Sequence, residues 1–240
     1  MHPPTAFDFA ITRQPNEVTC GPACLHAIYR HYGDDIDLDT LCNEVKPLAH
    51  GGTLAVMLAL HALRRGYKTT IYTCNLLLFD PTWFAPDGPP IRDRLVEQMK
   101  HKPDDVNLQV GSRAYLDYLD LGGALRMEDV TLDLLDRCIG SSTPVVAGLS
   151  ATWLYRCARE REDDYVSDDV AGLPLGHFVV LHGIDAGRRL VRVADPYRNV
   201  PYPDSHHYQV DVDRLIAAIL LGIVTYDAKL LIIEPGENGK

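Results

Sequence analysis

Three short apolar stretches in the second half of the chain constrain the fold most. They read PVVAGLS from Pro144, HFVVLHGI from His177 and RLVRVAD from Arg189. Short runs rich in β-branched residues and bounded by turn residues predict strands. The segment DAGR between the last two predicts an antiparallel hairpin. The run KLLIIE from Lys229 predicts a further strand.

Helical patterns dominate the first half of the chain. Apolar residues recur at helical spacing from about Thr19 to Gly33, and LAVMLALHALRR after Thr53 is apolar nearly all round, which is typical of a buried helix. A shorter helix is expected between Asp37 and Pro47. The segment KTTIYT predicts a strand, and Asp211 is expected to cap one more helix. Helices followed by an antiparallel sheet predict an α+β fold.

The charge and hydropathy of the chain exclude several classes of function. Its 240 residues include 23 Lys+Arg and 33 Asp+Glu, a net charge of -10, with no basic run. This makes nucleic acid or an anionic membrane surface a poor partner. No segment approaches the ~20 apolar residues of a membrane span, and the N-terminus lacks the pattern of a secretory signal. The six scattered cysteines favour a reducing, cytoplasmic location.

Cys20 begins the first predicted helix, in the segment CGPAC, and three interpretations of it are open. Most lone cysteines are buried and inert. A metal ligand is disfavoured, because no second Cys/His pair with suitable spacing follows. A thiol at a helix N-terminus faces unpaired N–H groups and the positive end of the helix dipole, which favours a nucleophilic thiolate. Cys24, one turn further on, is interpreted as a small core residue.

A nucleophilic cysteine needs a base, and that base needs a partner to orient it. Among the ten histidines, His177 stands out because it opens a strand directly after the turn segment GLPLG. Asp195 ends the neighbouring strand. If the two residues occupy corresponding ends of the hairpin, the carboxylate can fix the imidazole tautomer.

Together these residues resemble the papain-like cysteine peptidases that process the double-glycine leaders of bacteriocins. The similarity begins at Gln14 and the block at Cys20, continues through the HYG segment and the GGTL segment at Gly51, and closes with GHFVVLHGI at His177 and RVADP at Asp195. These blocks occur in the family's order over most of the chain.

The resemblance implies a role for each site residue. Cys20 would be the nucleophile, His177 the general base and later acid, and Asp195 the residue that orients His177. Gln14 would donate a side-chain N–H to the oxyanion hole beside the backbone N–H of Cys20, where each preorganised donor is worth ~3 kcal/mol. No cofactor or metal is implied.

Three features depart from the family pattern. Thr19 replaces the acidic residue that usually precedes the cysteine, and is expected to cap the helix instead. No transporter segment and no Walker-type loop is present in this sequence. Third, the regions at about 75–140 and 151–175 exceed what the family's compact domain needs, so residues 1–240 are interpreted as a single peptidase domain with insertions there.

The leading hypothesis is a cysteine peptidase or amide hydrolase that cleaves a peptide through an acyl-enzyme thioester. The resemblance implies a leader peptide as the substrate. Two alternatives stay open: an acyltransferase that uses the same triad with an amine as acceptor, and a peptide-binding module without catalysis.

Overall fold

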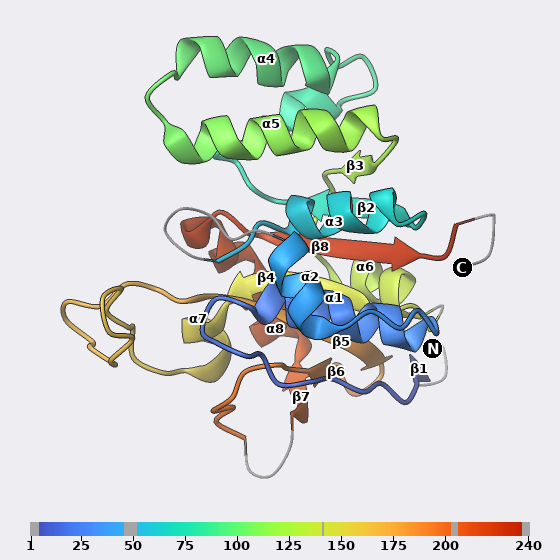
Figure 1. Ribbon diagram of the computed structural model, residues 1–240, viewed down its shortest axis with the longest axis vertical. Coiled ribbons are helices and arrows are strands. Elements are labelled where there is room, and N and C mark those ends of the chain that lie inside the picture. The colour runs from blue at the N-terminus through green and yellow to red at the C-terminus, as the bar shows by residue number, and fades with distance from the viewer. Residues whose placement is uncertain (1–4, 46–51, 141, 203–205, 237–240) are drawn as a thin grey trace.

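The protein is built on a mixed sheet, described here from a computed structural model that covers residues 5–45, 52–140, 142–202 and 206–236 (Figure 1). Along the sheet the described strands follow the order β3-β2-β8-β4-β5-β6-β7, and β1 pairs with β5 outside that path. All pairs are antiparallel except β2 with β3. The strands are β1 (Thr5–Ala6), β2 (Lys68–Thr73), β3 (Ala124–Arg126), β4 (Val145–Ser150), β5 (Gly176–Asp185), β6 (Leu190–Ala194), β7 (His207–Asp211) and β8 (Lys229–Glu234).

Helices cover both faces of this sheet. They are α1 (Cys20–His31), α2 (Leu38–Glu44), α3 (Ala55–Arg64), η1 (Pro81–Phe84), α4 (Ile91–His101), α5 (Val106–Asp120), α6 (Leu132–Ile139), α7 (Ala151–Tyr155), α8 (Val212–Leu221) and η2 (Gly222–Thr225). Within β5, Phe178 and Val180 join the hydrophobic cluster of α1 and α3, whereas Val179 and Leu181 join that of α6 and α8. The alternation of strand side chains therefore divides the core into two layers.

The segment between β2 and β4 contributes to both layers. Figure 1 shows α4 and α5 side by side at one end of the molecule, beyond α3 and β3. Leu95, Leu108 and Tyr115 of this pair are fully buried in the cluster that also contains Leu58 of α3. The later helix α6 packs instead in the cluster on the opposite side of the sheet. This segment is thus integrated into the hydrophobic core.

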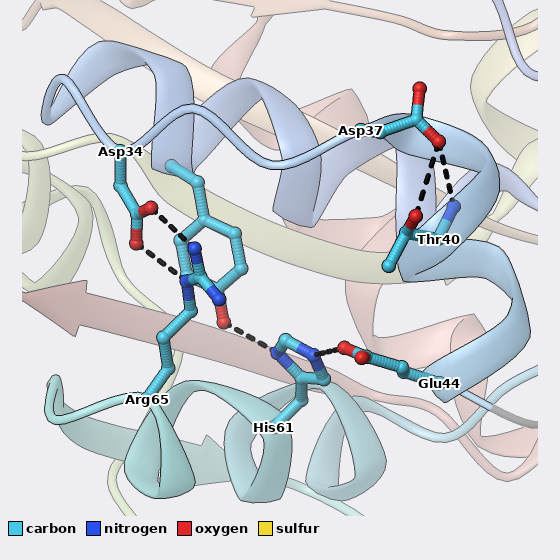
Figure 2. Close-up of polar contacts among 7 residues, drawn as sticks. Asp34, Asp37, Thr40, Glu44, His61 and Arg65 are labelled. Carbon is cyan, nitrogen blue, oxygen red and sulfur yellow. Dashed lines mark hydrogen bonds and ion pairs between the residues drawn. The ribbon is translucent and has the colours of Figure 1, made fainter.

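A polar network joins α1, α2 and α3 (Figure 2). The Arg65 guanidinium donates Nε–H and Nη2–H to the two oxygens of Asp34, each at 2.6 Å. His61 Nδ1 lies 2.8 Å from the Tyr29 hydroxyl, and its Nε2 lies 2.8 Å from a carboxylate oxygen of Glu44. The bidentate pair and the bridging imidazole fix the end of α1 against α3, which helps to set the position of α1 on the sheet.

Most elements expected from the sequence are present. The strands predicted at KTTIYT and KLLIIE match β2 and β8, and the hairpin across DAGR joins β5 to β6. Asp37 caps α2 by accepting the Thr40 N–H at 2.9 Å. Pro47 and Gly51, expected to end α2 and to start the GGTL segment, lie outside the described residues. In the part of the chain that the structure describes, no helix is long and apolar enough to cross a membrane.

Candidate active site

Cys20 is the first residue of α1, as the sequence predicts, and its side chain is 7% exposed. The preceding turn is closed by Thr19, whose hydroxyl donates to the Asn16 carbonyl at 3.1 Å and accepts the Asn16 N–H at 3.2 Å. That hydroxyl accepts no hydrogen bond from the first turn of the helix. The expectation that the Thr19 side chain caps α1 is therefore wrong, because Asn16 already engages it.

His177 and Asp195 meet at one end of the β5–β6 pair. His177 is the second residue of β5, and Asp195 directly follows β6, whose last residue, Ala194, lies opposite Val180. This register brings both side chains to the same edge, where His177 Nε2 lies 2.8 Å from Asp195 Oδ1. Asp195 is completely buried and His177 almost so. The hairpin predicted from the sequence therefore brings the two residues into contact.

The protonated form of His177 is stabilised by its surroundings. Burial alone would lower the pKa of His177, but the charge of Asp195 and hydrogen bonds with Asp195 and Cys20 raise it to about 10. The site can therefore hold an imidazolium beside the Cys20 sulfur.

Asp195 receives more hydrogen bonds than the sequence suggested. The Tyr155 and Tyr208 hydroxyls donate to Oδ2 at 2.6 and 2.7 Å, and the Tyr197 backbone N–H donates to Oδ1 at 2.9 Å. Burial opposes ionisation of Asp195, but the contacts with His177 and the two hydroxyls outweigh it, so its pKa is lowered. Sequence reasoning missed both tyrosines, although the alternation in HYQVD could have indicated the strand that carries Tyr208.

Gln14 is fixed against the loop that follows Asp195. Its backbone N–H donates to the Pro196 carbonyl at 2.9 Å, and its own carbonyl accepts from Arg198 Nε at 3.0 Å. The side-chain Nε2 donates to the Asn16 carbonyl at 2.9 Å, and the amide is 2% exposed. Because an amide nitrogen carries two hydrogens, this bond leaves one N–H available.

The remaining cysteines differ from Cys20. Cys24 is fully buried, its thiol donates to the Phe178 carbonyl at 3.3 Å, and burial raises its pKa well above the ordinary value. This supports its interpretation as a core residue. All six cysteines are free thiols. Among the described residues, no group of three or more His, Cys, Asp or Glu side chains is arranged to hold a metal ion.

A cavity of about 630 Å³ lies elsewhere, between the N-terminal segment and strands β5 to β7. Its walls include Phe7, Phe9 and His182, but neither Cys20 nor His177. The cavity is therefore separate from the contact between His177 and Asp195.

Comparison with solved structures defines the class of fold. A C39-like peptidase from Bacillus anthracis is 15% identical and superposes with a TM-score of 0.52 over 97% of this chain and 98% of its own. Xylellain, a cysteine protease from Xylella fastidiosa, is 15% identical and superposes with a TM-score of 0.48 over 98% of this chain and 86% of its own. The peptidase domain of Streptococcus ComA, a bifunctional ABC transporter, is 14% identical and superposes with a TM-score of 0.46 over 95% of this chain and 99% of its own. The α+β fold is therefore the fold of the C39-like peptidase.

A family match covers the segment that carries Cys20. Residues 8–82 match the family model of the Peptidase C39 family. No curated protein matches the chain in sequence. Together with the fold, this match over residues 8–82 indicates that the chain is a cysteine peptidase.

Proposed function

We propose that this peptidase cleaves a peptide bond through an acyl-enzyme thioester, with Cys20 as nucleophile, His177 as base and acid, and Asp195 as the residue that orients His177. The observation that carries the proposal is the buried 2.8 Å contact between His177 Nε2 and Asp195 Oδ1. It leaves His177 Nδ1 as the nitrogen for Cys20, and the neighbouring Cys20 thiol is one of the groups that raise the pKa of His177. Nucleophile, base and orienting group then form a chain of contacts.

The reaction follows from this arrangement. The Cys20 thiolate attacks the scissile carbonyl carbon, and the oxyanion accepts hydrogen bonds from the Cys20 backbone N–H and the Gln14 side-chain amide. The His177 imidazolium transfers its proton to the leaving amine, which departs as the C–N bond breaks. Neutral His177 then takes a proton from water, the resulting hydroxide attacks the thioester, and the carboxylic acid product leaves with Cys20 regenerated.

The substrate that we propose is a peptide, and the specific candidate is a leader that ends in a double glycine. The motif blocks around Gln14, Cys20, His177 and Asp195 support this choice, because they resemble those of the leader-processing peptidases. Two adjacent glycines carry no Cβ atoms, so such a segment can lie deep in a narrow site close to the buried nucleophile.

We also propose that residues 1–240 form one peptidase domain with insertions at about 75–140 and 151–175. The packing of Leu108 and Tyr115 in the same hydrophobic cluster as Leu58 supports a shared core. The contact of Tyr155 with Asp195 supports the inclusion of the second insertion in the site.

The first test measures alkylation of each cysteine by iodoacetamide, using mass spectrometry. At pH 6 an ordinary thiol, with a pKa of ~8.5, reacts slowly. We expect Cys20 alone to react rapidly, and to lose this reactivity in His177→Ala. If Cys20 reacts no faster than the other five cysteines and is indifferent to His177→Ala, the proposed pair is not assembled.

The second test uses peptides. A leader-like peptide with a Gly-Gly site should be cleaved after the second glycine by the wild type and left intact by Cys20→Ala. The control peptide replaces both glycines by valine, and the control variant is Cys42→Ala. Products formed with and without an added amine separate hydrolysis from acyl transfer, and stable binding without turnover would indicate the binding module.

A further inference from the structure

The Asp195 carboxylate accepts four hydrogen bonds in a site closed to solvent. His177 Nε2–H and the Tyr197 backbone N–H donate to Oδ1, at 2.8 and 2.9 Å. The Tyr155 and Tyr208 hydroxyls donate to Oδ2, at 2.6 and 2.7 Å. A carboxylate has about four lone-pair positions, so each oxygen of Asp195 is fully used. The carboxylate therefore has no freedom to rotate without breaking a buried hydrogen bond.

The two hydroxyl donors lie on different secondary-structure elements. Tyr155 ends α7, a helix held by Ser150, whose hydroxyl accepts the Trp153 N–H at 3.4 Å, and closed by the left-handed residue Arg156. Tyr208 lies on β7, the neighbour of β6. Both side chains are half-buried, and neither hydroxyl is needed by the sheet or the helix for its own hydrogen bonds. Their common target is Oδ2.

We propose that Tyr155 and Tyr208 are positioning residues, which clamp Oδ2 of Asp195 so that Oδ1 faces His177 Nε2 and leaves Nδ1 for Cys20. This inference rests on the proposed function, since it assigns the clamp to the same triad. The two tyrosine hydroxyls donate to Asp195. They act through Asp195, by fixing the orientation and tautomer of the imidazole.

The aromatic rings add a second constraint on the imidazole. The ring centroids of Tyr155 and Tyr197 lie 6.2 and 5.8 Å from that of His177, and the two tyrosine rings stack 6.0 Å apart with an interplanar angle of 16°. Together they limit water access to the contact between His177 and Asp195, which strengthens that hydrogen bond. Tyr155 thus contributes a ring to His177 and a hydroxyl to Asp195.

The test replaces each hydroxyl by hydrogen and keeps the ring, in Tyr155→Phe, Tyr208→Phe and the double variant. The matched control is Tyr32→Phe, which removes a tyrosine hydroxyl that donates to the Ile233 carbonyl at 2.9 Å. Tyr32 follows the other end of α1, about 18 Å from Cys20 by the helical rise. The probes are the His177 Nε2–H resonance in nitrogen-15 spectra and the rate of Cys20 alkylation by iodoacetamide at pH 6.

We expect the wild type to show a slowly exchanging His177 Nε2–H. In each clamp variant this proton should exchange at least tenfold faster and alkylation of Cys20 should slow several-fold, with a larger effect in the double variant and none in Tyr32→Phe. Unchanged exchange or unchanged alkylation in the double variant would overturn the clamp. If a variant does not fold, the wild-type spectrum still tests the clamp, because the absence of a slowly exchanging His177 Nε2–H from the wild type would overturn it.

The two proposals fail separately. Loss of the protected Nε2–H in the clamp variants, together with no cleavage of any peptide by the wild type, supports the clamp and contradicts the peptidase mechanism. Peptide cleavage that depends on Cys20 but is unaffected by both tyrosine substitutions supports the mechanism and contradicts the clamp.

Discussion

Lys229 and Asp227 form an ion pair inside the protein, with Nζ 3.0 Å from Oδ1 and both side chains almost completely buried. Lys229 also donates to the Tyr226 carbonyl at 2.9 Å and lies 5.6 Å from the centre of the Tyr115 ring. Asp227 Oδ1 accepts the N–H of Ala55, the first residue of α3, at 3.4 Å. The pair therefore connects β8 to the beginning of α3 and to α5.

Removal of one member of this pair should be costly, because the other charge stays buried. We expect Lys229→Met to lower the free energy of unfolding by about 3–5 kcal/mol, and a double variant with Asp227→Leu to recover part of that loss. Urea denaturation measures both. The control is Lys100→Met, which breaks an exposed pair with Glu97 and should cost far less. Equal losses at Lys229 and Lys100 would contradict the prediction.

The contact between His177 and Asp195 should make stability depend on pH. The folded-state pKa of His177, about 10, lies above the ~6.5 of an unfolded histidine, so its contribution is complete below pH ~6.5 and is lost as the pH rises towards 10. The lowered pKa of Asp195 makes its contribution complete above pH ~4, and that contribution is lost in acid. The difference in unfolding free energy between wild type and His177→Gln should therefore be largest near pH 5–6 and shrink by pH 10. A difference that grows from pH 7 to pH 10 would refute this.

Gln14→Ala separates oxyanion stabilisation from assembly of the triad. Loss of one oxyanion donor lowers kcat about a hundredfold or more in enzymes of this kind. Alkylation of Cys20 by iodoacetamide forms no oxyanion, so we expect its rate to stay at the wild-type level while peptide cleavage falls. A parallel fall in both rates would mean that Gln14 supports the structure of the site and does not act on the transition state.

Gly148 allows β4 to pass close to the segment before β8. A Cβ atom at this position would lie 2.5 Å from the Asp227 carbonyl oxygen. We expect Gly148→Ala to lower the free energy of unfolding by about 1–3 kcal/mol through overpacking. Gly122→Ala is the comparison, because Gly122 has φ +83° but no atom within 4 Å of an added Cβ, so it reports backbone strain alone. Thermal unfolding that leaves Gly148→Ala as stable as the wild type would contradict the close contact.

The sequence predicted those parts of the fold that depend on local patterns. The periodicity around Cys20 and the apolar runs at His177 and Lys229 matched α1, β5 and β8. These elements are visible in the sequence because the spacing of apolar residues along a helix or strand follows which of its faces is buried. The hairpin also predicted the contact of His177 with Asp195. The catalytic roles of these residues and of Gln14 remain predictions.

Other features depended on contacts between distant segments, which a single sequence does not encode locally. The two tyrosines on Asp195 come from α7 and β7, and no spacing rule relates them to Asp195. The parallel pairing of β2 with β3 depends on how the intervening helices return the chain to the sheet. The failure of Thr19 to cap α1 has a local cause, since Asn16 competes for its hydroxyl.

The N-terminal helix and the sheet that holds His177 are joined by contacts across most of the chain. The bond from the Cys24 thiol to the Phe178 carbonyl spans 154 residues, and that from Arg198 to the Gln14 carbonyl spans 184. A ribosome adds about 5–20 residues per second, so Cys20 is synthesised on the order of ten seconds before His177. During that interval the nascent chain carries a thiol without its imidazole. The contact between His177 and Asp195 can therefore form beside α1 only after translation has passed Asp195.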